Sequence, residues 1–315
     1  RIMTEQELAN VVWDIKEIIR NLYDDAEVED VILPFTLLRR LDCVLDEKRE
    51  AIMEEIKDLP EDQVKYKLRG LMRRNGLTFF NTSGLSLEKL LNAPDQIGDS
   101  FATYLNGFTE NVRDILANFV HTETNTDAVD LSRIYARLDR SDKLFAVTQK
   151  FVQKADLHPD RVSNTMMGTV FEIIIRRSKE STNTKAGQFY TPREIVSFMV
   201  DESIKDYLSK TVKNLTSENI QILFNDNVEC YNSDNKVEIV NALKSMKILD
   251  PACGSGAFPM GALQRIVHLI QKCNGVTSDK NSLYSLKLDL IEKCLYGVDI
   301  QPIAVQICKL RFFIS

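Results

Sequence analysis

The segment with the clearest chemical potential runs from Lys247 to Phe258, where an apolar stretch meets an aspartate and two glycines. Ile248 and Leu249 predict the end of a buried strand, and apolar residues recur at helical spacing from Ala257 onward. Glycines without a Cβ let the turn between them bend sharply and approach a ligand, while the N–H groups that start the helix face it. The candidate ligand-contacting residues are Asp250, Gly254, Ser255, Gly256 and Ala257.

A second carboxylate stands downstream, at the end of the predicted strand Cys294–Asp299, which precedes a helix from Pro302 through Leu310. In doubly wound sheets, an acidic residue at the end of the second strand accepts hydrogen bonds from a ribose diol, and Asp299 fits that role. The long spacing from Asp250 is absorbed by an extra helix over 282–293. The alternative interpretation is that Asp299 caps the following helix.

The third candidate segment, Gly187–Glu194, lies upstream of both carboxylates. Thr191 as N-cap, Pro192 at the first helical position and Glu194 at the third predict a capping box with a proline start. That interpretation leaves an aromatic pair, Phe189 and Tyr190, unexplained in a polar loop.

Several site classes are disfavoured or excluded by the residues present. A dinucleotide fingerprint needs a third glycine at position 259, where this sequence has proline. The Gly-x-x-x-x-Gly-Lys-Ser/Thr loop of nucleotide hydrolases does not occur. The three histidines are isolated in the sequence, and no Cys-x-x-Cys pair occurs, so no metal site is expected.

Together, Gln188-Phe-Tyr-Thr-Pro-Arg193, Asp250-Pro-Ala-Cys-Gly-Ser-Gly256 and Tyr296-Gly-Val-Asp299 resemble the amino-group DNA methyltransferases. Their order matches the adenine-N6 branch, in particular the modification subunit of type I restriction-modification systems. The resemblance implies that the first motif packs over the methionine end of S-adenosylmethionine, the glycine turn passes beneath this cofactor, and Asp299 holds its ribose. The implied cofactor residues are Gln188, Phe189, Tyr190, Thr191, Pro192, Arg193, Asp250, Gly254, Ser255, Gly256, Ala257 and Asp299.

The rest of the chain supplies the elements that must position these motifs. Thr4 and Glu7 predict a capping box, and apolar residues at helical spacing follow it. No strand-like alternation of any length occurs in the N-terminal part. Leu8–Trp13, Val31–Cys43 and Phe80–Gly84 resemble the helical N-terminal domain of type I modification subunits. We therefore expect an α plus α/β chain: a helical domain over 1–155, then part of a Rossmann-like methyltransferase domain over 156–315.

Three local expectations concern the helical domain. A second helical run is expected to follow Pro34, on the apolar residues Leu37, Leu38, Leu41, Val44 and Leu45. Trp13 lies off the apolar stripe of the first helix and is expected to pack against a neighbouring helix. Arg39 and Arg40 are expected on an exposed helix face, with contact to DNA as the alternative.

Charge and composition indicate the setting of the protein. A formal net charge of −6 is unfavourable for gripping DNA alone, so partners are expected. The resemblance implies double-stranded DNA, a specificity subunit and a restriction subunit. Scattered cysteines and the lack of a long apolar run or signal segment favour a cytoplasmic protein without membrane contact.

The sequence as a whole predicts a site-specific adenine-N6 DNA methyltransferase that uses S-adenosylmethionine. In the family that it resembles, a tetrapeptide with Pro-Pro and an aromatic residue receives the flipped base. The 315-residue sequence contains no Pro-Pro pair. We therefore expect no catalytic residue within this stretch and no activity from it alone. The alternatives are a non-catalytic fragment that docks a specificity subunit, part of a fused restriction-and-modification or phage-defence methyltransferase, and another cofactor-binding α/β enzyme.

Overall fold

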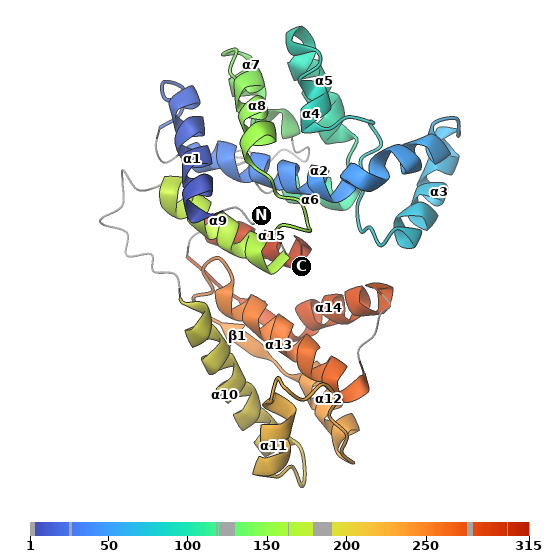
Figure 1. Ribbon diagram of the computed structural model, residues 1–315, viewed down its shortest axis with the longest axis vertical. Helices are drawn as coiled ribbons and strands as arrows, with labels where there is room; N and C mark the ends of the chain where they lie inside the picture. Colours follow the sequence, from blue (N-terminus) through green and yellow to red (C-terminus); the bar gives the residue numbers. More distant parts are fainter. Residues whose placement is uncertain are drawn as a thin grey trace. The chain divides into compact units, whose positions relative to one another are not determined.

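The computed structural model describes residues 4–24, 27–117, 119, 130–162, 164–178, 191–275, 280–300 and 302–314. The chain divides into two compact units, Arg1–Gly187 and Gln188–Ser315, which are described separately (Figure 1). The described part of the chain is mostly helical and contains one sheet of two parallel strands.

Among the described residues of the first unit, the regular elements are all helices, apart from an isolated bridge between Asn81 and Phe108. Its centre is α2, which is buried along much of its length and contacts α1, α3, α4, α8 and α9. Phe35 of α2 stacks on Phe151 and contacts the tilted ring of Phe101, with both pairs of ring centroids 5.5 Å apart. The elements are α1 (Glu5–Ile19), α2 (Val28–Ile56), α3 (Glu61–Arg74), α4 (Leu87–Leu90), η1 (Pro94–Gln96), α5 (Ile97–Asn106), α6 (Glu110–Ala117), η2 (Leu131–Ile134), α7 (Ala136–Asp139), α8 (Leu144–Lys154) and α9 (Asn164–Ser178).

Helix starts show where local sequence decides the structure and where it does not. The capping box at the start of α1 is confirmed, because Thr4 and Glu7 exchange both bonds. The expectation that the second helix follows Pro34 is wrong: α2 begins at Val28 and continues through this proline. Ile32, Leu33 and Phe35 beside it are fully buried, so tertiary packing offsets the hydrogen bond that proline removes.

Three large side chains of this unit also differ from expectation. Trp13 is 64% exposed, so the expected packing against a neighbouring helix is wrong. Arg40 is buried and donates to the carbonyls of Leu157 and Val162, at 2.6 and 2.7 Å. Arg39 is partly buried and donates to the carbonyl of Ala155 at 2.9 Å. Both arginines fasten α2 to the loop after α8, which excludes the exposed face predicted for them.

The second unit contains the sheet and the helices that cover one of its faces. β1 (Ile248–Asp250) pairs in parallel with β2 (Leu295–Gly297), with Asp250 opposite Gly297. Ile248 and Leu295 pack against the core, whereas Leu249 and Tyr296 are 63% and 47% exposed. The helices are α10 (Arg193–Thr211), α11 (Ser217–Phe224), α12 (Lys236–Ser245), α13 (Ala257–Asn274), α14 (Lys280–Cys294) and α15 (Pro302–Ile314).

The predicted fold is confirmed in its coarser form, as a helical first part followed by a unit with parallel strands and helices. The Rossmann-like class of that unit stays a prediction, as does the domain boundary at 155/156. Helix α9 lies beyond that boundary yet packs against α1 and α2 of the first unit. Within the described residues, no helix has both the length and the apolar character needed to cross a membrane.

Candidate cofactor site

The predicted strand, glycine turn and helix are present as β1, residues 251–256 and α13. Hydrogen bonds continue the parallel pairing past the strands: Val298 donates to the carbonyl of Asp250 at 3.0 Å, and Cys253 to that of Val298 at 2.9 Å. The turn is therefore fixed to the segment that follows β2. This pairing places the carboxyl ends of both strands, and hence Asp250 and Asp299, at one edge of the sheet.

The two glycines of the turn occupy their positions for different structural reasons. Gly256 has φ +90° as the N-cap of α13, and a Cβ built there would lie 2.5 Å from the Sγ of Cys308 in α15. Gly254 also has a positive φ, of +52°, but a Cβ there would meet nothing within 4 Å. Gly256 is therefore required by packing, whereas the space beside Gly254 is open to a ligand.

The two carboxylates flank this turn. Asp250 Oδ1 accepts the N–H of Ala252 at 3.1 Å, while its Oδ2 is buried and has no hydrogen-bond partner among the described residues. Asp299 Oδ2 accepts the N–H of Gly254 at 2.8 Å. The carboxylate that follows the second strand is thus hydrogen-bonded to the glycine turn. A ligand bound at that turn would lie within reach of Asp299.

The third motif begins α10 differently from the prediction. Pro192, not Thr191, is the N-cap: its carbonyl accepts the N–H groups of Ile195 and Val196, each at 3.1 Å. No side-chain cap bond is present, so the predicted capping box is wrong. A proline N-cap has no side-chain acceptor, and Thr191 stands one residue too early to serve. Gln188, Phe189 and Tyr190 lie outside the described residues.

Packing between α10 and α13 sets the position of Thr191, Pro192 and Arg193 relative to the glycine turn. A Cβ at Gly261 would lie 2.7 Å from Val196, so the first turns of the two helices approach closely. Arg265 of α13 then holds Asp201 of α10 with two bonds, at 2.7 and 2.9 Å. Both helices begin at the same end of the unit (Figure 1). The start of α10 therefore lies at the same end as the turn.

One cysteine of the turn, Cys253, and one that packs against it, Cys308, are not poised as nucleophiles. Burial raises the pKa of the Cys253 thiol and raises the pKa of Cys308 to about 12. Both thiols stay protonated at neutral pH, and only a thiolate is strongly nucleophilic. Their role is packing, since Cys308 lies against Gly256 and Cys253 lies against Gly297.

The residues present fit a ligand that carries hydrogen-bond donors, such as a nucleoside. An aspartate oxygen that is buried without a hydrogen-bond partner needs a donor, because such groups are costly to leave unpaired. The open side of Gly254 allows close approach to the backbone. Asp299 offers carboxylate oxygens to hydroxyl donors such as those of a ribose.

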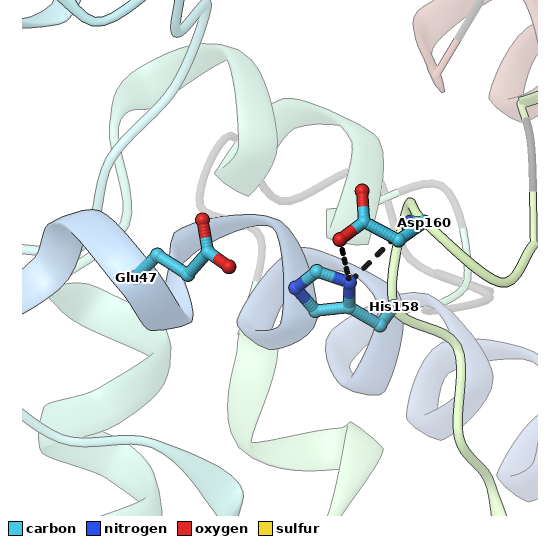
Figure 2. A group of neighbouring side chains, drawn as sticks. All are labelled: Glu47, His158 and Asp160. Atoms are coloured by element: carbon cyan, nitrogen blue, oxygen red, sulfur yellow. Dashed lines mark hydrogen bonds and ion pairs between the residues drawn. The ribbon is translucent and has the colours of Figure 1, made fainter.

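One group of possible metal ligands was missed by sequence reasoning, because its members are far apart in the chain. Glu47 of α2, His158 and Asp160 have ligand atoms within 4.8 Å of one another, and both acids are exposed. The imidazole lies between the two carboxylates (Figure 2). Its Nδ1 is 3.5 Å from Asp160 Oδ2 and accepts that residue's N–H at 3.3 Å. The fold brings these three side chains together, and the prediction of no metal site stays a prediction.

Two family models match successive stretches of the chain. Residues 8–151 match the family model of the HsdM N-terminal domain, and residues 162–219 match that of N-6 DNA methylase. The chain carries an HsdM N-terminal domain and part of an N-6 DNA methylase domain. The first match spans most of the helical unit. The second spans α9, α10 and the segment between them, and it ends at residue 219, before β1 and the glycine turn.

Three relatives support this assignment at low identity. A Methanocaldococcus jannaschii protein named as a type II restriction enzyme and methyltransferase is 24% identical over 310 residues, which is 95% of this chain and 23% of the relative. The methylase subunit of a type I restriction enzyme from the same organism is 23% identical, over 98% of this chain and 45% of the subunit. A Streptomyces coelicolor adenine-specific methyltransferase is 36% identical over 72 residues, which are 23% of this chain and 6% of that protein. The chain is therefore a distant homologue of N-6 DNA methylases from restriction-modification systems and spans less than half of each relative.

Proposed function

We propose that this chain provides the cofactor-binding side of an adenine-N6 DNA methyltransferase that uses S-adenosylmethionine. The observation that carries the proposal is the hydrogen bond from the Gly254 N–H to Asp299, beside the unpartnered oxygen of Asp250. The family matches over residues 8–151 and 162–219 support it. S-adenosylmethionine, when bound, supplies an activated methyl group.

In this proposal, each candidate site residue binds or orients the cofactor. Asp299 accepts hydrogen bonds from the ribose, and the hydrogen bond from Gly254 fixes its carboxylate. The open side of Gly254 lets the cofactor lie against the backbone. Asp250 receives a donor at its buried Oδ2, and the first turn of α13 offers N–H groups, since Gly256 provides no side-chain cap. Gln188 to Arg193 cover the methionine end of the cofactor.

The choice of cofactor is tested by thermal unfolding of the 315-residue chain with added ligands. A ligand that binds only the folded state raises the melting temperature with its concentration. S-adenosylmethionine and its demethylated product are expected to raise the melting temperature, whereas NAD⁺ is expected to leave it unchanged. A larger rise with NAD⁺ would contradict the proposal and favour a dinucleotide enzyme.

The acceptor side of the reaction is proposed to come from other residues. These 315 residues hold no Pro-Pro pair, and positioning of the acceptor contributes up to about 7–11 kcal/mol to lowering the barrier. We expect no methyl transfer from radiolabelled cofactor to adenine-containing duplex by the isolated 315 residues. Turnover by a preparation of that intact mass would contradict this expectation.

The partners of the chain are part of the same proposal. A specificity subunit and a restriction subunit, or fused segments with their functions, would supply site recognition and cleavage. The names of two relatives favour this setting, since one is a type I methylase subunit and one a type II restriction enzyme and methyltransferase. Tight, sequence-selective DNA binding by the chain alone in a gel-shift assay would contradict it.

A further inference from the structure

Helix α3 presents a strongly basic exposed face that the proposed function does not use. We call it the α3 basic face and define it as Lys65, Tyr66, Arg69, Gly70, Arg73 and Arg74. Leu68 and Leu71 are buried on the opposite side of the helix, which packs against α2 at the edge of the helical unit (Figure 1). Each charged side chain of the face is exposed, and Tyr66 is 78% exposed.

The cations of this face have no ion-pair partner among the residues that the structure describes. Lys67 of the same helix pairs with Glu55 of α2 at 3.2 Å. Lys65, Arg69, Arg73 and Arg74, in contrast, form no ion pair or side-chain hydrogen bond with any residue that the structure describes. Lys65, Arg69 and Arg73 follow one another at i, i+4 spacing, where like charges destabilise a helix. An external anion bound along this face would relieve that repulsion.

Gly70 provides an independent indication of a partner. It lies inside a helix, where glycine is less stable than alanine. A Cβ at Gly70 would meet nothing within 4 Å, so no packing inside the described structure requires glycine there. The residue leaves a gap between Tyr66 and Arg73 through which a partner could approach the helix backbone.

We propose that the α3 basic face binds the phosphate backbone of a nucleic-acid duplex. Arginine, lysine and tyrosine side chains are the usual donors to phosphate oxygens, and three cations four residues apart span roughly 12 Å along a helix. A protein partner would need apolar anchors at its centre, and Tyr66 is the single exposed large apolar side chain described on α3. The proposal requires neither cofactor binding nor methyl transfer.

This face also resolves a difficulty raised by the charge of the whole chain. A net charge of −6 disfavours DNA binding by a uniformly charged protein. The segregation of unpaired cations onto one helix gives a local site despite that excess of acid. Binding there positions the chain on DNA without reading its sequence, because phosphate contacts carry no sequence information.

The test measures binding of a short random-sequence duplex to the 315-residue chain by fluorescence anisotropy, over a series of salt concentrations. For Arg69→Gln/Arg73→Gln we expect roughly tenfold weaker binding at low salt and a salt slope smaller by about 2, since each phosphate contact contributes about 0.9. The matched control is Arg20→Gln/Lys210→Gln, which removes two exposed cations that are paired with Glu17 and Asp206. The control should retain the wild-type slope.

A second variant separates loss of binding from loss of folding. Gly70→Glu should raise the melting temperature, because glutamate is the better helix former, and should also abolish duplex binding. Absence of duplex binding by the wild-type chain at low salt, or an equal effect of the control, would overturn the proposal. Unchanged binding in Arg69→Gln/Arg73→Gln would overturn it as well and direct the search toward an acidic protein. Cofactor binding should be unaffected in every variant, so failure here is distinct from failure of the proposed function.

Discussion

Two aspartates, one in each unit, differ in how the surrounding residues pair their carboxylate oxygens. Asp42 of α2 is 1% exposed and uses both oxygens: Oδ1 binds Arg49 at 2.8 Å, and Oδ2 accepts the N–H of Leu87 at 2.6 Å. Asp250 uses Oδ1 for its own turn and leaves a buried Oδ2 without a hydrogen-bond partner among the described residues. A fully paired acid stabilises a fold, whereas a half-paired acid beside an open glycine is suited to a ligand.

The largest effect is expected from breaking the fully paired acid. Arg49→Ala leaves the charge of Asp42 buried without its partner, which should lower the free energy of unfolding of the helical unit by about 3–5 kcal/mol. Chemical denaturation followed by circular dichroism measures this. Arg137→Ala removes an exposed pair with Glu27 and serves as the control, with an expected cost below about 1 kcal/mol. Equal costs in the two variants would contradict the structural role assigned to Asp42.

The two glycines of the cofactor turn allow the same comparison, between a residue that the fold requires and a residue that is open to a ligand. Gly256→Ala combines a left-handed φ, costing about 1–2 kcal/mol, with overpacking against Cys308, costing about 1–3 kcal/mol. Gly254→Ala carries only the backbone cost, because its Cβ would meet nothing. Denaturant midpoints should therefore fall further for Gly256→Ala. Gly254→Ala is expected to weaken ligand binding and to lose no more stability than the backbone cost. A loss of stability larger than that of Gly256→Ala would contradict the open space assigned beside Gly254.

The sequence predicted those features that depend on a few neighbouring residues. The capping box of Thr4 and Glu7, the strand and glycine turn before Ala257, and the extra helix before Cys294 were all foreseeable, because spacing and residue type decide them locally. Thr191 and Glu194 fit the pattern of a capping box as well as Thr4 and Glu7 do. The helix nevertheless begins one residue later than this pattern predicts. Local pattern therefore predicts that a helix starts more reliably than it predicts which residue caps it.

Features that depend on distant residues could not be predicted. Arg40 is drawn into the core by carbonyls more than a hundred residues away, and Pro34 is held inside a helix by its buried neighbours. The contact of Gly256 with Cys308 and the cluster around His158 also join segments that are far apart in sequence. The basic residues of the α3 basic face can be read in the sequence. Only the structure shows that their side chains are exposed and have no ion-pair partner among the described residues.

The central claim, that Asp299 and the glycine turn bind S-adenosylmethionine, is tested most directly by titration calorimetry. Loss of hydrogen bonds to a charged group costs about 1.5–3 kcal/mol, so Asp299→Ala should bind this cofactor roughly ten- to hundred-fold more weakly than the wild-type chain. The control is Asp289→Ala, which removes an exposed carboxylate of α14 that pairs with Lys293, and its affinity should match that of the wild type. Equal affinity of Asp299→Ala and the wild type would contradict the account.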